Sequence, residues 1–398
     1  MNRFQSSRSL TPLYCLHQAV YFFAMAGVGA FAVTYLLTHD FGAAQIGVML
    51  AATNILSCVL QPIIGSYVDR TSICLLQKLV PAFLMTSFAA LASIELFPLS
   101  KPVISLLYIL GHLAFSITIP LYNPLCVYYA QRGYRIDYGA GSGIGSLSFS
   151  FASLGFGYII AHLGASAMIW VVLLCLVLQL ILVQFYPRLR PDEQAPRTRS
   201  EQTSSLSIAA FARRYRLFMV TMVGVVCLAA CHAMAENYLI QIFGRIGGGS
   251  EHVGVALFLA CVTAAPFILF FERIQRRTGV VILMRLSGLF YIAKALLLIF
   301  APSISSVYLI ELLQTVTYGF LYPSLYYLVA GRIQPQDMAK GQTIASATFT
   351  LGMALGSSLG GAAIERLGLS AMLVIAACIA LAGTILVNAA VSKADVPA

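Results

Sequence analysis

The sequence is poor in charge. Only 10% of its 398 residues are Asp, Glu, Lys or Arg, whereas 60% are hydrophobic. Because a soluble domain carries about a quarter charged residues, a soluble globular protein is excluded. The net charge is +10, but the basic residues lie between hydrophobic segments and form no single patch, so we expect no nucleic-acid partner. With a mean hydropathy of +0.87, the composition predicts an integral membrane protein.

The sequence also lacks the motifs of several functional classes. The nine cysteines form no Cys-x-x-Cys pair and no metal-ligand spacing, which favours a role as small hydrophobic residues. Glycines such as Gly352, Gly356 and Gly360 follow no strand and precede no Lys-Ser/Thr pair, so they indicate close helix packing rather than a phosphate loop. We expect no metal, no cofactor, no ATP-driven step and no cleavable signal peptide.

An intramembrane enzyme is also not expected. Such an enzyme needs a metal-ligand spacing of His and Glu, or a nucleophile with a base nearby. His232 and Glu236, four residues apart, come nearest to this pattern, and no third ligand accompanies them.

Long hydrophobic runs dominate the rest of the chain. A helical span needs about 20 apolar residues, and twelve stretches reach that length. They run near 11–38, 43–68, 78–98, 102–130, 139–162, 165–186, 215–243, 250–272, 280–300, 303–331, 339–364 and 369–392. The sequence therefore predicts an all-α membrane protein with twelve transmembrane helices.

A polar segment rich in Pro, Arg and Ser divides these spans into two groups of six. We expect an N-terminal bundle over 1–186, a cytoplasmic linker over 187–214 and a C-terminal bundle over 215–398. The segment Leu163–Met168 recurs as Leu367–Met372 at the corresponding place in the second group. This echo predicts two parallel repeats around a central cavity, which is a known transporter plan.

Lys and Arg are distributed asymmetrically between the spans. With both termini inside, the outer loops hold only Lys101, Arg245 and Arg366, and Lys294 lies inside the membrane. By the positive-inside rule we expect a multi-pass protein of the plasma membrane with both termini in the cytoplasm.

Two short motifs carry a family resemblance. Gly65-Ser66-Tyr67-Val68-Asp69-Arg70 follows the second span, and Tyr138-Gly139 precedes Gly145-Ser146 in the fifth. With twelve spans and a basic central segment, the first motif resembles the Gly-x-x-x-Asp-Arg signature of the major facilitator superfamily. The second is similar to a pattern of its oligosaccharide–proton and nucleoside–proton symporters. The resemblance implies alternating access, with spans 1, 4, 7 and 10 lining the cavity.

Three ionisable residues lie inside the predicted spans. Burying charge in a membrane is costly, so each is expected to have a functional or structural role that offsets this cost. They are Glu236 in the seventh span, Lys294 in the ninth and Glu311 in the tenth. The helical rise places them at similar depth, and we expect Lys294 within reach of Glu311. We interpret all three as proton-coupling residues. The alternative is a permanent salt bridge that only fixes helix packing.

The stretch 305–327 combines a carboxylate with an aromatic stripe that helical spacing places on one face. We expect this face to border the cavity. The predicted substrate-binding residues, drawn from the expected cavity spans, are His17, Tyr21, His112, His232, Asn237, Tyr308, Gln314, Tyr318 and Tyr322. The alternative for each histidine and aromatic residue is ordinary helix packing. Asp69, Arg70, Glu272 and Arg273 are predicted gate charges, with loop solvation as the alternative.

Together these features predict a monomeric secondary active transporter, embedded in the lipid bilayer. It would move a small organic solute, sugar- or nucleoside-like, by alternating access and symport with protons. Two alternatives stay open: proton-driven efflux of drugs or sugars, and a membrane sensor without flux. A Tyr stripe suits any amphiphilic solute, so composition does not separate these substrates.

Overall fold

A computed structural model describes residues 9–70, 73–130, 133–187 and 207–391. Within these ranges the side chains at 62, 65–70, 73–77, 123–128 and 130 are not described. The described chain is helical almost throughout, and its one extended pairing is an isolated bridge between Ser9 and Arg135. It contains 12 helical segments that are long and apolar enough to cross a membrane. The predicted all-α fold and the predicted number of spans are confirmed.

The chain divides into two compact units. The first comprises residues 1–32 and 56–198, and the second comprises 33–55 and 199–398. The predicted bundles over 1–186 and 215–398 stay a prediction about domain organisation.

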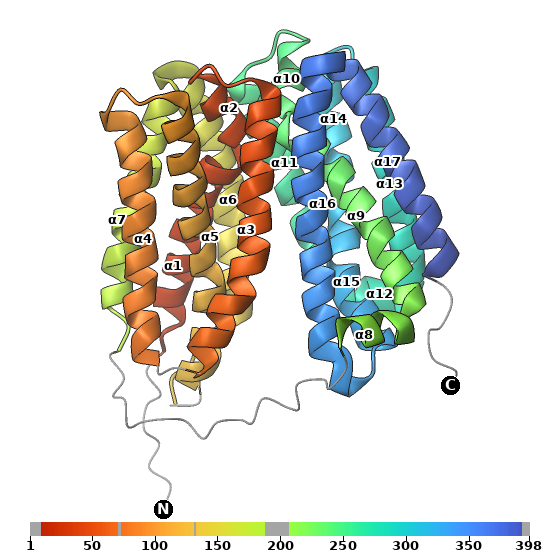
Figure 1. Ribbon diagram of the computed structural model, residues 1–398, viewed down its shortest axis with the longest axis horizontal. Coiled ribbons are helices and arrows are strands. Elements are labelled where there is room, and N and C mark those ends of the chain that lie inside the picture. The colour runs from red at the N-terminus through yellow and green to blue at the C-terminus, as the bar shows by residue number, and fades with distance from the viewer. Residues whose placement is uncertain (1–8, 71–72, 131–132, 188–206, 392–398) are drawn as a thin grey trace, which may run out of the picture. The chain divides into compact units, whose positions relative to one another are not determined.

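The α-helices of the first unit are labelled in Figure 1. They are α1 (Thr11–Met25), α4 (Ile73–Leu96), α5 (Lys101–Ala130), α6 (Tyr138–Leu163) and α7 (Ala165–Gln184), and the π-helix η1 (Ala26–Ala30) follows α1. Two further helices, α2 (Ala32–Leu37) and α3 (Ala43–Arg70), cross the division between the units. The predicted span 11–38 is therefore three helical pieces and not one.

The π-helix interrupts this first span where its sequence is Ala-Gly-Val-Gly-Ala. The irregular backbone is supported from outside, because the Tyr108 hydroxyl of α5 donates to the Val28 carbonyl at 2.6 Å. Gly27 lies so close to Val172 and Phe156 that a methyl group there would meet both side chains. The absence of a side chain thus lets this segment pack on α6 and α7.

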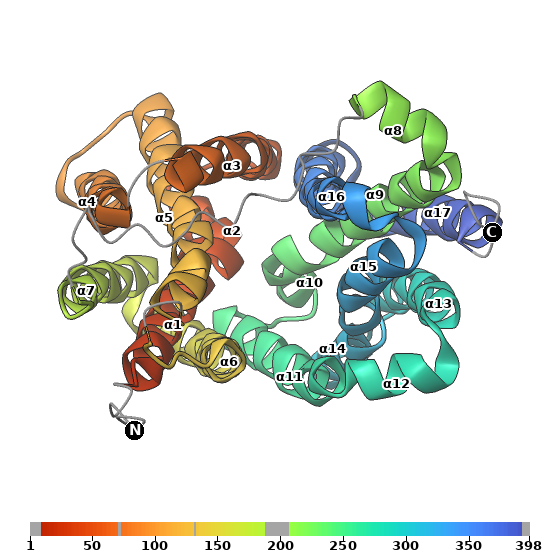
Figure 2. The same ribbon diagram turned by 90° about the horizontal axis from the view of Figure 1, so that it is seen from below.

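Helices of the second unit surround α9 (Arg216–Asn237), which packs most extensively against α16 (Met338–Leu367) and α17 (Leu369–Ala390). Figure 2 shows α9 beside both. The other elements are α8 (Ile208–Arg214), α10 (Leu239–Gly244), α11 (Ser250–Leu269), α12 (Phe271–Thr278), α13 (Val280–Ile299), α14 (Ile304–Glu311), the 3₁₀-helix η2 (Leu312–Thr315), α15 (Tyr318–Arg332) and the 3₁₀-helix η3 (Pro335–Asp337).

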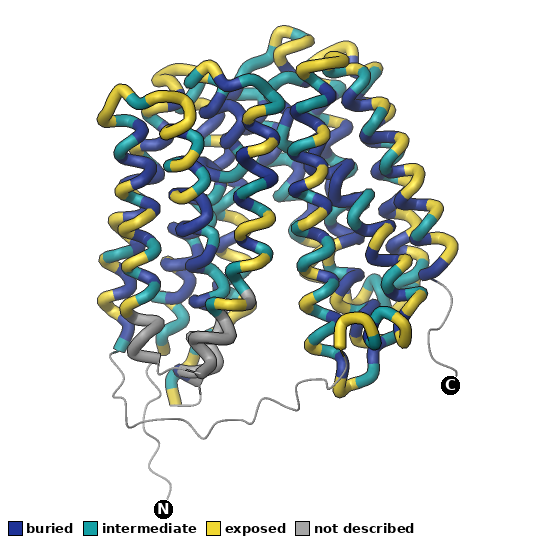
Figure 3. The backbone as a smooth tube through the Cα atoms, viewed as in Figure 1, coloured by how far each residue is buried: buried dark blue, intermediate teal, exposed yellow. Residues whose placement is uncertain are grey.

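Glycines on α16 make this packing possible. A methyl group at Gly352 or Gly356 would collide with the backbone of α9, and one at Gly360 would meet the Tyr238 ring. The predicted role of these glycines in close helix approach is confirmed. Figure 3 shows that buried and exposed positions alternate along most helices, so that one side of each helix packs inside the protein.

Residues 33–55 group with the second unit because the start of α3 packs on α16. The Ala44 amide donates to Glu365 Oε2 at 2.9 Å, which satisfies one of the free amides of the helix start. A methyl group at Gly47 would collide with the Ser357 carbonyl. The Tyr238 hydroxyl donates to the same carbonyl at 2.5 Å.

The two similar segments Leu163–Met168 and Leu367–Met372 also have similar backbone conformations. Gly164 joins α6 to α7 with φ 88° and ψ 165°, and Gly368 joins α16 to α17 with φ 86° and ψ 167°. A positive φ is readily adopted only by glycine. The nearly equal dihedral angles at these corresponding junctions agree with the predicted parallel repeat, which stays a prediction.

Candidate functional site

Lys294 holds two carboxylates and an amide inside the second unit. Its Nζ lies 2.6 Å from Glu236 Oε1, 2.8 Å from Glu311 Oε2 and 3.0 Å from Gln314 Oε1. An ammonium group has three N–H donors, so all three are used. Lys294 is 2% exposed and Glu311 is fully buried. The expected proximity of Lys294 and Glu311 is confirmed, and Glu236 joins them.

The backbone around Glu311 departs from the prediction. The segment 305–327 was expected to be one helix with one polar face, whereas α14 ends at Glu311 and η2 follows before α15 begins at Tyr318. In a 3₁₀-helix the side chains three residues apart eclipse one another. Glu311 and Gln314 therefore point to the same side and reach the same ammonium group.

Side chains of neighbouring residues stabilise this break. Ser287 Oγ of α13 donates to the Thr317 carbonyl at 2.8 Å, and Thr317 Oγ1 donates to the Leu313 carbonyl at 3.0 Å. The same two carbonyls also accept backbone hydrogen bonds, Leu313 from the Val316 and Thr317 amides and Thr317 from the Leu321 amide. The backbone at the break is thus satisfied inside the protein, as an apolar environment demands.

The cluster of Lys294, Glu236 and Glu311 is unbalanced in charge. With both carboxyls ionised it carries one net negative charge, although the side chains of Lys294, Glu236 and Glu311 are only 3%, 11% and 0% exposed. Burying a net charge is costly, and one bound proton makes the cluster neutral. Glu311 Oε1 is buried without a hydrogen-bond partner. The arrangement can therefore take up and release one proton.

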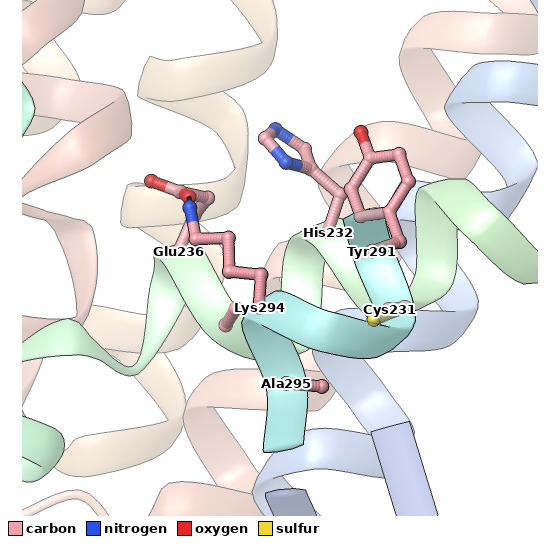
Figure 4. Close-up of a pocket in the computed structure, with 7 residues that line it drawn as sticks. Cys231, His232, Glu236, Tyr291, Lys294 and Ala295 are labelled. Carbon is pink, nitrogen blue, oxygen red and sulfur yellow. Dashed lines mark hydrogen bonds and ion pairs between the residues drawn. The ribbon is translucent and has the colours of Figure 1, made fainter. Parts of the chain in front are cut away.

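Figure 4 shows the small pocket at this cluster, in which Glu236 and Lys294 meet and His232 and Tyr291 lie beside one another. The pocket is lined by Cys231, His232, Ala235, Glu236, Tyr291, Lys294 and Ala295, and it has no room for a water molecule. Burial reduces the screening of these charges by water, which strengthens their interaction.

An aromatic stack extends from this pocket along α15. We use this name for His232, Tyr318, Tyr322 and Phe349. His232 stacks on Tyr318 with centroids 5.3 Å apart, Tyr318 stacks on Tyr322 at 5.3 Å, and Phe349 meets Tyr322 edge-on at 5.3 Å. Tyr322 is 48% exposed, so one end of the stack is open. Phe349 was not predicted, because a Phe in an apolar helix carries no functional signal.

Two other predicted substrate residues lie elsewhere in the second unit. Tyr308 packs with His252, with ring centroids 6.4 Å apart, and with Phe243 at 5.8 Å. Asn237 Nδ2 donates to Ser357 Oγ at 2.8 Å, which ties α9 to α16. Both side chains have protein partners, and their predicted contact with substrate stays a prediction.

The predicted residues of the first unit are buried among aromatic rings. His17 lies 3.9 Å from Tyr122 between ring centroids, and neither of its ring nitrogens has a hydrogen-bond partner. Tyr21 stacks on Phe115 at 4.6 Å. His112 is 7% exposed. A role of these three residues in substrate binding stays a prediction.

The predicted gate charges are only partly described. The side chains of Asp69 and Arg70 lie outside the described residues. Glu272 pairs with Arg276, with 2.6 Å between Oε1 and a guanidinium nitrogen. Arg273 lies over the Phe270 ring at 5.9 Å. Gating by these residues stays a prediction.

The matching family model and a relative of similar sequence both indicate a transporter. The model of a family described as the MFS_1 like family matches residues 14–375. A maltose permease of Geobacillus stearothermophilus is 28% identical over 325 residues, which cover 80% of this chain and 76% of the permease.

Solved structures share the fold. A crystal structure of the nucleoside transporter NupG matches with a TM-score of 0.76 and 16% identity, covering 96% of this chain and 98% of that one. A POT family transporter in complex with a thioalcohol-conjugated peptide matches with a TM-score of 0.71 and 12% identity, covering 95% of both chains.

Proposed function

Since this chain belongs to the MFS_1 like family, we propose that it is a proton-coupled symporter for a small polar solute of the sugar or nucleoside class. Like its relatives, the protein is a multi-pass membrane transporter of solutes, and it is not an enzyme. Proton coupling and the substrate class are the proposed parts.

The observation that carries the proposal is the ammonium group of Lys294 between two buried carboxylates. One proton neutralises the cluster, and it also weakens one of the two ion pairs. Glu311 is the last residue of α14 and Gln314 belongs to η2, so Lys294 bonds on both sides of the break. A change in protonation thereby biases the backbone between α14 and α15, which is how a bound proton shifts a two-state equilibrium.

Other polar groups lie beside the cluster. Cys231 and His232 on α9 and Tyr291 on α13 line its pocket, and Gln314 on η2 accepts a bond from Lys294. Of the residues that the structure describes, only the two glutamates bond to Lys294 as carboxylates, and we assign the coupling proton to these two residues.

His232 connects the cluster to the aromatic stack. It lies one helical turn before Glu236, on the same side of α9, and it stacks on Tyr318. Aromatic faces with polar edges suit both the apolar face of a sugar ring and a nucleobase. A maltose permease and a nucleoside transporter among the similar proteins support this class. A solute on the open end of the stack would contact Tyr322, and Tyr318 and His232 connect that end to the proton site.

The test is solute-driven proton movement in proteoliposomes that enclose a pH-sensitive dye. Maltose and uridine are added as representatives of the two classes. We expect one of them to drive proton uptake by the wild type, and Glu311→Gln to lose this uptake. Glu251→Gln is the matched control, because Glu251 pairs with His252 on α11, away from Lys294. Proton uptake that persists in both Glu236→Gln and Glu311→Gln would refute the proposal.

A further inference from the structure

Helix α12 is strongly amphipathic. Phe271 and Ile274 on its inner side pack with Leu283 of α13 and Phe320 of α15, and the Phe271 ring lies 5.5 Å from that of Tyr327. Figure 2 shows α12 beside α13, with α15 close by. The outer side is basic and exposed. It carries Arg273, Arg276 and Arg277, with Glu272 as its one acid. This anchoring makes α12 a fixed part of the second unit.

A groove of about 310 Å³ lies against this helix. It is lined by Leu269, Phe270, Glu272, Arg273 and Arg276. Leu269 and Phe270 are 76% and 51% exposed, and they stand at the end of α11, which is apolar enough to span the membrane. One wall is therefore suited to acyl chains and the other to a negative charge.

The arginine side chains are held beside the apolar wall. The Arg273 guanidinium lies over the Phe270 ring at 5.9 Å, and Arg276 is bonded to Glu272 at 2.6 Å. A guanidinium fork matches the oxygens of a phosphate. Glu272 offsets only one of the two positive charges of Arg273 and Arg276, so the lining of the groove keeps a net positive charge. A groove with this charge and with exposed apolar side chains beside it suits a ligand that has both a phosphate and hydrocarbon.

We propose that the groove binds an anionic phospholipid, with the headgroup phosphate at Arg273 and Arg276 and the acyl chains against Leu269 and Phe270. The inference concerns a surface separate from Lys294 and does not depend on the proposed transport. A free phosphate would use the same arginines, but it would leave the apolar wall uncovered. Basic residues at the edge of a membrane attract anionic lipids for the same electrostatic reason.

The experiment measures lipid retention by the full chain in native mass spectrometry, with phosphatidylglycerol or phosphatidylcholine added. We expect the wild type to retain phosphatidylglycerol preferentially. Each basic residue near a membrane surface contributes about 1 kcal/mol, or roughly fivefold in affinity. The double variant Arg273→Gln/Arg276→Gln is therefore expected to lose roughly 25-fold. Arg366→Gln is the matched control, since Arg366 is exposed at the end of α16.

Two further variants separate lipid binding from misfolding. Glu272→Gln removes the acid that competes for Arg276, so it is expected to retain phosphatidylglycerol more strongly than the wild type. Arg276→Lys keeps the charge and should retain most of the lipid. The proposal is wrong if the double variant binds phosphatidylglycerol as the wild type does, or if the wild type does not distinguish the two lipids. Displacement of the lipid by millimolar inorganic phosphate would instead indicate a free-phosphate site and would also overturn it.

Discussion

Lys294 Nζ and Glu311 Oε2 lie 2.8 Å apart, and their side chains are only 3% and 0% exposed. Such a pair would be neutral by itself. The second carboxylate, Glu236, at 2.6 Å from the same nitrogen, removes that neutrality. The cluster therefore carries a net negative charge whenever both carboxyls are ionised.

Replacing Glu311 by Gln is expected to uncouple transport from the proton gradient. The amide keeps the size of the side chain and can still accept a bond from Lys294, but it cannot bind a proton. Downhill exchange of solute across the membrane should persist, whereas accumulation against a gradient should be lost. Radiolabelled uptake and counterflow in proteoliposomes measure the two separately. Loss of both activities would point to a structural role for Glu311.

Removing the lysine tests the charge balance directly. Lys294→Met leaves Glu236 and Glu311 buried without a cation, and breaking a buried pair in this way costs about 3–5 kcal/mol. We expect a lower melting temperature at neutral pH. Stability should then rise as the pH falls, because protonation removes the buried negative charges. The double variant Lys294→Met/Glu311→Gln should recover much of the loss. A variant that melts like the wild type at neutral pH would contradict this prediction.

Close packing of α9 and α16 gives a stability prediction. A methyl group at Gly356 would collide with the backbone of Ala230, so Gly356→Ala is expected to destabilise the protein by about 1–3 kcal/mol. Gly155 on α6 is the matched control, since nothing lies within 4 Å of a methyl group placed there. Thermal unfolding in detergent compares the two. Equal melting temperatures would show that α16 shifts to accommodate the new side chain.

The cluster was partly predictable from the sequence for a simple reason. Charged residues in apolar segments are rare and need partners of opposite charge. Lys294 and Glu311 lie on neighbouring predicted spans, so their pairing could be predicted from the sequence. The break after Glu311 was not predictable. No proline or glycine lies within η2, and the bond that supports the break comes from Ser287 on another helix.

Other contacts depended on tertiary packing in the same way. Tyr308 belongs to the same polar stripe in the sequence as Tyr318 and Tyr322. The break at η2 interrupts the helical register, and Tyr308 packs with His252 instead. Phe349 completes the aromatic stack from α16, although nothing in its sequence neighbourhood distinguishes it from a core residue.

The aromatic stack gives the last prediction. Tyr322 is the half-exposed end of the stack, so a solute that binds there covers its ring. An aromatic pair contributes about 0.5–1.5 kcal/mol beyond the area it buries, and Tyr322→Ala is expected to weaken solute binding by up to roughly tenfold. Tyr326→Ala is the matched control: Tyr326 is 61% exposed on the same helix, and its ring contacts that of Tyr327. Ligand-induced shifts of the melting temperature measure the affinity. A solute that binds both variants equally well does not use the stack, and the search for its site would move to His17, Tyr21 and His112.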